Sequence, residues 1–306
     1  MKIHVRGLIL AVACTAVCGS RASAQLLFGS TTTATTNGAA FYLDVNTSAV
    51  TTLWNSATNK KVNDLAADDA DGRLYANDAA RLNVWNYGNL GITPTFIAGM
   101  YRTNDNVSFS ATGVDGLAYV NGNLYGATSF PSSTFKRGIY QINTVPDAAA
   151  HCVMTPLWVD NTGTAISLGD LDYNAADNRF YVTSTNDTTG SGGTFGLGLY
   201  SIDAFGSGTV TKIADFPAGR RNVDGLAIGG GKFWMTEHEP GASRIDIYPY
   251  DPVSGTYGAT IFMPLTDATQ RATGATWSPN ALPEPASIGV LAFLGLVLAR
   301  RRGSSR

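Results

Sequence analysis

The chain has 306 residues, of which 44% are hydrophobic and 14% charged, and its formal net charge at pH 7 is −2. Between two terminal segments described below, residues 25 to 282 carry 14 Lys and Arg against 22 Asp and Glu, a net charge of about −8. That length suits one large domain or two small ones, and an acidic body excludes a nucleic acid as the expected partner.

The first 24 residues have the composition of a secretory signal peptide. Lys2 and Arg6 precede an apolar stretch from Leu8 to Val17, and the small residues Ala22-Ser23-Ala24 stand before Gln25. We therefore predict export through the Sec machinery and cleavage after Ala24. Because Cys14 and Cys18 belong to this segment, Cys152 is alone in the remaining chain, and no internal disulfide can form there.

Residues 25 to 282 have the composition of strands joined by turns. They are rich in Gly, Thr, Asn and Ser, and their aromatic residues lie in short apolar runs with no sustained helical period. This pattern predicts an all-β fold. The longest expected loops span residues 101 to 113 and 185 to 197.

A two-part phrase recurs four times at a spacing near fifty residues. Its first part reads Val-Asp-Gly-Leu-Ala or a close variant, with the aspartates at Asp64, Asp115, Asp170 and Asp224. Its second part follows as Arg73-Leu74-Tyr75, Asn123-Leu124-Tyr125, Arg179-Phe180-Tyr181 and Lys232-Phe233-Trp234. Turn formers such as Asp71-Gly72 and Asn121-Gly122 separate the two parts, so we expect each phrase to be a β-hairpin.

Two further apolar runs complete each repeat. The third strand is predicted at residues 82–85, 139–142, 199–202 and 245–248, and the fourth at 95–97, 156–158, 210–213 and 260–262. Four strands in sequence order make the blade of a β-propeller. The alternative is a stack of hairpins or a sandwich that never closes.

The two ends of this region complement each other. Residues 26 to 56 supply second, third and fourth strands without a first, and the missing first strand stands at Thr273–Trp277. Pairing these ends would close a ring and leave no exposed sheet edge. We therefore expect a β-propeller of five four-stranded blades over residues 25–282. The Asp-Gly-Leu-Ala and Leu-Tyr phrases resemble those of NHL, lactonase and quinoprotein-like propellers.

The four repeated aspartates are the first candidates for a site. If first strands line the centre of the ring, Asp64, Asp115, Asp170 and Asp224 would gather near one mouth, where carboxylates can hold Ca²⁺. The alternative is that each aspartate accepts N–H groups of its own turn, since a repeat reproduces structural residues just as regularly. The fifth equivalent position is Thr273, which breaks the symmetry.

Other candidates are isolated. Glu237 follows a second strand and could lie at the mouth of the ring, but we favour the interpretation that it contributes polarity to an exposed loop. Cys152 is a nucleophile or a small buried residue. The five tryptophans could stack on sugars if exposed; Trp54, Trp85 and Trp158 occupy strand positions where packing between blades is the natural role.

The last 24 residues form a three-part tail, with Pro283-Glu284-Pro285, an apolar run from Ala286 to Ala299, and Arg300-Arg301-Arg302. As a helix the apolar run would rise about 21 Å, short of the roughly 30 Å hydrocarbon core. The order resembles the PEP-CTERM sorting tail, which in that family is read by a membrane protease-transferase called an exosortase. The resemblance implies transient insertion in the inner membrane with the arginines inside; an ordinary short C-terminal anchor is the alternative.

Together these features favour an exported protein of the cell surface or extracellular matrix, with a signal peptide at 1–24, a propeller at 25–282 and a sorting tail at 283–306. We expect a non-catalytic structural module, or a binder of polysaccharide or protein, that needs no cofactor. The alternative is a glycoside hydrolase or lactonase that uses carboxylates such as Asp115, Asp170, Asp224 and Glu237.

Overall fold

The computed structural model describes residues 25–32, 38–55, 62–78, 81–87, 95–98, 100–103, 114–128, 136–160, 166–185, 195–239, 243–265 and 270–278. The segments predicted as a signal peptide and a sorting tail lie outside these residues, as do most of the two long loops expected at 101–113 and 185–197. Within the described residues every regular element is a β-strand. No helix among them is long and apolar enough to cross a membrane.

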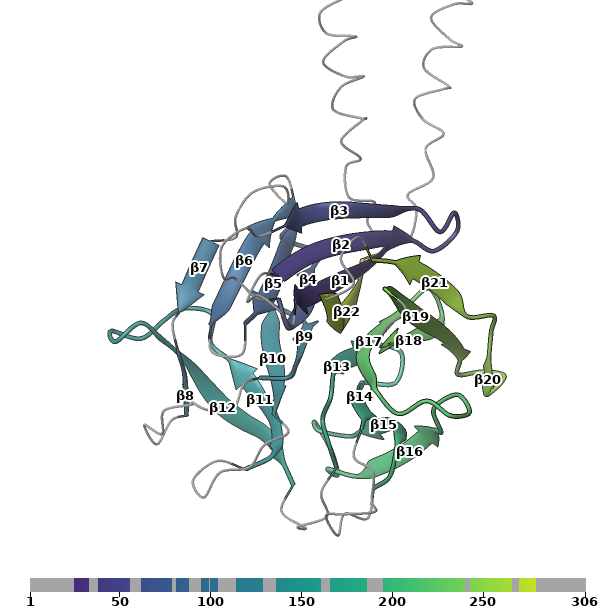
Figure 1. The fold of residues 1–306 in the computed structure, drawn as a ribbon. Coiled ribbons are helices and arrows are strands. Elements are labelled where there is room, and N and C mark those ends of the chain that lie inside the picture. Colours follow the sequence, from purple (N-terminus) through teal and green to yellow (C-terminus); the bar gives the residue numbers. More distant parts are fainter. Residues whose placement is uncertain are drawn as a thin grey trace, which may run out of the picture.

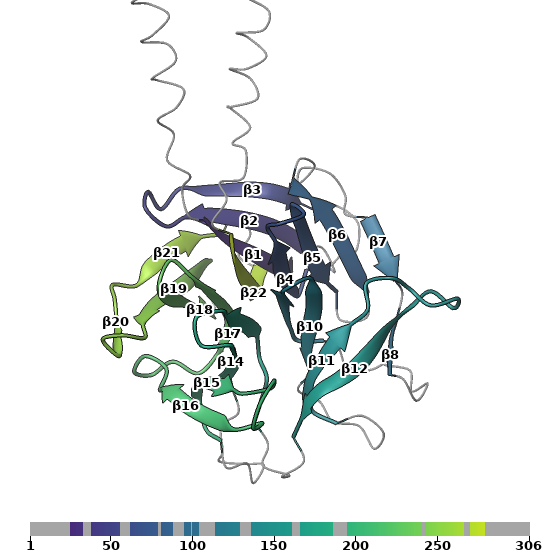
Figure 2. The same ribbon diagram turned by 180° about the vertical axis from the view of Figure 1, so that it is seen from behind.

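The strands form five sheets, arranged around a common centre as a β-propeller (Figures 1 and 2). The first sheet contains β22 (Gln270–Ser278), β1 (Gln25–Thr32), β2 (Gly38–Asp44) and β3 (Val50–Asn55). The second contains β4 (Asp64–Asp68), β5 (Arg73–Asn77), β6 (Leu82–Asn86) and β7 (Thr95–Ala98). The third contains β9 (Gly116–Val120), β10 (Asn123–Thr128), β11 (Gly138–Ile142), β12 (His151–Val159) and β8 (Met100–Thr103).

The remaining two sheets follow the same antiparallel order. The fourth contains β13 (Leu171–Asn174), β14 (Arg179–Ser184), β15 (Gly198–Ile202) and β16 (Val210–Ala214). The fifth contains β17 (Val223–Gly229), β18 (Lys232–Glu239) and β19 (Arg244–Asp251), and β19 pairs with both β20 (Thr256–Tyr257) and β21 (Ile261–Pro264).

The two-part phrases form the predicted hairpins. β4 pairs with β5, β9 with β10, β13 with β14 and β17 with β18, all antiparallel. Both residues of the Asn121-Gly122 turn have positive φ, 48° and 85°, as the mirror-image hairpin turns require. This requirement explains why Asn and Gly occupy these two positions. The third and fourth strands also lie where the sequence predicts them.

The predicted pairing of the chain ends is confirmed. β1 lies antiparallel between β2 and β22, with Gln25 opposite Ser278 and Thr32 opposite Gln270. The innermost strands then contact one another in a complete circle, from β22 to β4, β9, β13 and β17 and back to β22. An N-terminal segment and a C-terminal segment thus share one sheet and close the ring.

The hydrophobic core is divided among the gaps between neighbouring sheets. The described residues contain a cluster of buried side chains at each successive pair of sheets around the circle. At the gap between the first and second sheets, Trp54 meets Trp85 edge to face with ring centroids 5.4 Å apart. Packing between sheets is therefore the role of these two tryptophans, as predicted.

The expected loop at 101–113 begins differently from the prediction. β8 (Met100–Thr103) adds a parallel strand to the edge of the third sheet, against β12. Four residues are too few to show the alternation of apolar and polar side chains that marks a strand, so the sequence does not distinguish this segment from a loop. What creates the strand is the free edge of β12, whose unpaired backbone groups accept another segment.

Candidate functional site

Two of the four repeated aspartates meet at the centre of the ring. Asp64 begins β4 and Asp170 directly precedes β13, and both side chains are completely buried. Their carboxyl groups interact directly, although the second and fourth sheets are not neighbours in the circle. The pair therefore joins sheets on opposite sides of the centre.

Asp170 accepts three backbone N–H groups. Its Oδ1 accepts from Leu171 at 2.6 Å, and its Oδ2 accepts from Leu226 at 2.5 Å and from Ala275 at 3.3 Å. Leu226 lies in β17 and Ala275 in β22, so one carboxyl group holds the innermost strands of two other sheets. The three N–H donors satisfy the oxygens of this carboxyl group, which offsets part of the cost of burying it.

Asp64 makes the contact with the third sheet. Its Oδ2 accepts a hydrogen bond from the backbone N–H of Leu117 in β9. Together Asp64 and Asp170 thus contact the innermost strand of every sheet: β4, β9, β13, β17 and β22. We call these two residues the carboxyl pair.

Burial disfavours ionisation of both members of the carboxyl pair. Burial raises the pKa of Asp64 and of Asp170 well above the usual range, because neither carboxylate has water around it. Two carboxyl groups can bond directly only if one of them carries a proton. Direct contact between these two carboxyl groups therefore favours a form in which one of them is protonated.

The centre leaves no room for side chains beside this pair. A Cβ placed on Gly274 of β22 would overlap the Asp64 carboxylate, and a Cβ on Gly116 of β9 would overlap the backbone N of Leu171. The glycines of the repeated phrase are therefore required by the close approach of neighbouring innermost strands.

Asp115 and Asp224 are placed differently from the carboxyl pair. Both are partly exposed, and each is followed by a glycine, whereas Asp64 and Asp170 are followed by leucine. The described residues contain no group of three or more His, Cys, Asp or Glu side chains arranged to hold a metal ion. The structure thus brings two of the four aspartates together and does not gather all four around one point.

A third acidic residue at the centre was not singled out in the sequence. Asp172 lies two residues after Asp170, and its carboxylate accepts N–H groups from Tyr173 at 2.7 Å and from Ile228 in β17 at 2.6 Å. Burial raises the pKa of Asp172 to about 7. The signal for it was available, because residues two apart on a strand share a face and only this repeat has Asp-Leu-Asp.

Glu237 lies in a charged cluster on the fifth sheet. Its Oε2 is 3.3 Å from the Arg220 guanidinium and accepts a hydrogen bond from the Tyr248 hydroxyl at 2.9 Å. Asp246 is fully buried beside it, 3.5 Å from Arg220 and 2.7 Å from Arg244. Burial and the neighbouring Glu237 carboxylate raise the pKa of Tyr248, which keeps that hydroxyl a donor. Glu237 is thus buried and paired, unlike an exposed loop residue.

Cys152 is a buried residue of β12. Its side chain has no exposed surface, and burial raises the pKa of the thiol to about 12. A thiol that stays protonated is a poor nucleophile. The interpretation as a small core residue is therefore the one that fits.

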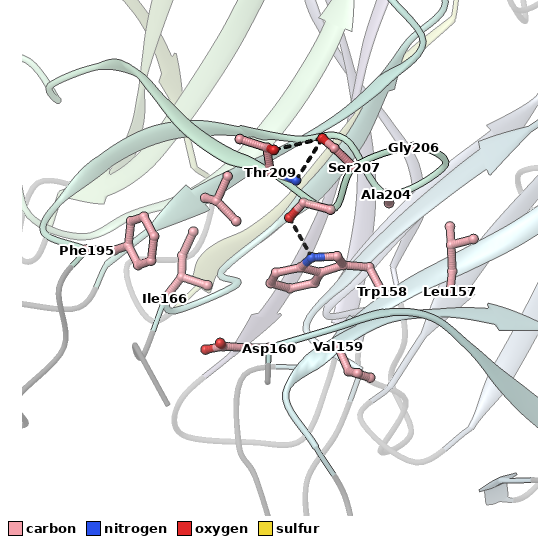
Figure 3. Close-up of a pocket in the computed structure, with 12 residues that line it drawn as sticks. Leu157, Trp158, Val159, Asp160, Ile166, Phe195, Ala204, Gly206, Ser207 and Thr209 are labelled. Atoms are coloured by element: carbon pink, nitrogen blue, oxygen red, sulfur yellow. Dashed lines mark hydrogen bonds between the residues drawn. The ribbon is translucent and has the colours of Figure 1, made fainter. Parts of the chain in front are cut away.

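One concavity of about 590 Å³ lies between the third and fourth sheets (Figure 3). Trp158 of β12 lies across it, with the turn between β15 and β16 on one side and Asp160 on the other. The indole Nε1 donates to the carbonyl of Gly208 at 3.0 Å, which ties the two sheets together. Ile166 and Phe195 supply an apolar wall. We call this the Trp158 cleft.

The turn above the indole is held in one conformation. Asp203 accepts hydrogen bonds from the backbone N–H and the hydroxyl of Ser207, at 3.0 and 2.8 Å. The hydroxyls of Ser207 and Thr209 are 2.7 Å apart and both line the cleft. An apolar wall with a few fixed polar groups is the usual composition of a ligand site.

No protein-family model matches the chain, and no curated protein matches it. Among solved structures, TolB from Acinetobacter baumannii is similar with a TM-score of 0.42 at 12% identity, over 90% of this chain and 72% of that one. A protein of unknown function from Bacteroides caccae has a TM-score of 0.46 at 10% identity, over 83% and 98%. A putative 6-phosphogluconolactonase from Bacteroides fragilis has 0.43 at 10%, over 85% and 99%. Similarity this low carries no information about function.

Proposed function

We propose that this protein is an exported β-propeller whose five sheets are the blades of one closed ring, and that it acts at the cell surface or in the extracellular matrix. Its role is non-catalytic: it is a structural component or a module that binds polysaccharide or protein. Residues 1–24 direct it to the Sec machinery, and residues 283–306 hold it transiently in the inner membrane for an exosortase-like enzyme.

The observation that carries the non-catalytic role is the use of the carboxyl pair. Asp64 and Asp170 are two of the four aspartates that the repeat presents as candidates for chemistry, and their oxygens bind backbone N–H groups of four innermost strands. Glu237 is likewise committed to Arg220 and Tyr248. The hollows that suit a ligand lie instead between sheets, as the Trp158 cleft does.

Export and sorting rest on the two terminal segments. A charged start, an apolar run and Ala22-Ser23-Ala24 support the signal peptide, and three ordered elements at the chain end support the sorting tail. An acidic body without internal disulfides is compatible with folding outside the cell on the strength of its core.

The test is fractionation of a bacterium that carries an exosortase and expresses the full chain. We expect to find the protein at the cell surface or in the matrix, with residues 1–24 removed. A variant with Ala at Pro283, Glu284 and Pro285 should accumulate in the inner membrane. Finding the intact protein in the cytoplasm would refute the proposal, and surface delivery of the variant would refute the sorting step.

A further inference from the structure

A second concavity, also of about 590 Å³, lies between the second and third sheets. Its wall from the second sheet comes from the β4–β5 hairpin, and its wall from the third sheet comes from the β9–β10 hairpin, β11 and β12. The side chains that matter here are polar or aromatic: Asp71, Arg73, Tyr75, Tyr119, Asn123 and Gln141. We call this the tyrosine groove.

Two amide side chains are fixed in the wall from the third sheet. Gln141 Nε2 donates to Asn123 Oδ1 at 2.8 Å, and Asn123 Nδ2 donates to the carbonyl of Asn121 at 3.2 Å. Each bond uses one N–H of its amide, so each amide keeps a second N–H and Gln141 keeps its oxygen for a ligand. Groups that are already oriented lose little entropy when a ligand binds.

The two tyrosines join the walls of the groove. Tyr75 of β5 and Tyr119 of β9 stack with ring centroids 5.7 Å apart and an interplanar angle of 16°. Arg73 lies beside Tyr75, and Asp68 lies beside Tyr119. This packing holds the aromatic edges and hydroxyls of the groove in place, as rigid amphipathic rings do at many binding surfaces.

The groove has no net charge. Asp71 and Arg73 are its only ionised lining residues among those described, and their charged groups are 3.7 Å apart, with side chains 60% and 47% exposed. A polyanion would be attracted by the Arg73 guanidinium and repelled by the Asp71 carboxylate. The charge balance therefore favours a neutral ligand that offers several donors and acceptors at once.

We propose that the tyrosine groove binds a neutral oligosaccharide. Sugar hydroxyls both donate and accept, which suits the free N–H groups and oxygen of Asn123 and Gln141 and the charged atoms of Asp71 and Arg73. The volume of about 590 Å³ is more than one sugar unit fills, so it suits a chain of sugar units. This inference rests on the proposed binding role and names its ligand class and site.

The test is isothermal titration calorimetry with the full chain, purified in a detergent without a sugar headgroup. The probes are cellohexaose, maltohexaose and mannohexaose, with a galacturonate hexamer as the anionic comparison. We expect at least one neutral hexamer to bind at least tenfold more tightly than galacturonate. Gln141→Ala should weaken that binding at least fivefold, because its side chain is exposed and the change leaves the fold intact.

Asn123→Ala should give a similar loss, and Asn46→Ala, which removes an exposed amide far from the groove in sequence, should give none. Thermal melts of all variants verify that they are folded. Absence of binding by all three neutral hexamers, tighter binding of galacturonate, or unchanged binding by Gln141→Ala would each overturn the inference. Such a result would leave the proposed role standing, because export and sorting are tested separately by fractionation.

Discussion

The carboxyl groups of Asp64 and Asp170 interact across the centre of the ring, and between them these two residues contact the innermost strand of all five sheets. Neither residue is near the other in sequence, and their sheets are not neighbours. The carboxyl pair therefore connects parts of the molecule that the packing between adjacent sheets does not connect directly.

Asp170→Ala should be strongly destabilising. It leaves three N–H groups without an acceptor in a buried place, and we expect a loss of about 3 kcal/mol or more in the free energy of unfolding. Asp170→Asn should lose less, because the amide keeps one oxygen acceptor. Urea denaturation measures both. Asp215→Ala is the matched control, since that side chain is 86% exposed, and it should cost no more than about 1 kcal/mol. Equal losses for Asp170→Ala and the control would contradict the structural role of Asp170.

The centre should reject even one methyl group. Gly274→Ala would drive a Cβ into the Asp64 carboxylate, and we expect a loss of about 3 kcal/mol or failure to fold. Gly219→Ala is the control, because no atom lies within 4 Å of the added Cβ and only the positive φ of 81° is unfavourable. That change should cost about 1 kcal/mol. Denaturation midpoints that do not separate the two variants would show that the strands are less closely packed than described.

Stability should fall as the pH rises from 4 to 7. Asp172 has its pKa raised to about 7, above the value near 3.9 of an unfolded chain. Between these values the folded protein binds more protons than the unfolded chain, so raising the pH favours unfolding. The carboxyl pair acts with the same sign, because its pKa values are also raised.

The check is urea denaturation at pH 5 and pH 8 for the wild type and Asp172→Asn. The variant lacks the titrating group, so its difference in stability between the two pH values should be smaller. Identical differences in both proteins would mean that Asp172 ionises normally in the folded state.

Cys152 should be unreactive while the protein is folded. Its thiol is fully buried and its pKa is raised to about 12, so little thiolate forms at pH 8. Iodoacetamide should modify the peptide containing Cys152 at least a hundredfold faster in 8 M urea than in buffer, as followed by mass spectrometry. Rapid modification in buffer would show that β12 opens or that the thiol is accessible.

The repeat and the complementary chain ends were sufficient to predict the hairpins, the third and fourth strands and the pairing of β1 with β22. These features depend on the local pattern of apolar residues and on which segments lack a pairing partner, and both can be read from the sequence. β8 was missed because a four-residue strand at a free edge has no periodicity of its own. The carboxyl pair was missed because the repeat presents Asp64, Asp115, Asp170 and Asp224 as equivalent.

The difference among those aspartates lies in the residue that follows. Where glycine follows, as at Asp115, the backbone approaches the next strand closely and the aspartate stays partly exposed; where leucine follows, as at Asp170, the carboxyl group is buried. Neither hollow between sheets was predicted. Each is formed by turns and strand ends from two repeats, whose relative placement depends on the closed ring and not on the spacing of one repeat.

The most direct test of the central claim is a crystal structure at atomic resolution, grown in the presence of calcium. We predict that the carboxyl groups of Asp64 and Asp170 lie in direct hydrogen-bond contact, with unequal C–O bond lengths in one of the two that mark its proton and with no ion between them. A calcium ion coordinated by these two carboxylates would contradict the account and make the centre of the ring a metal site.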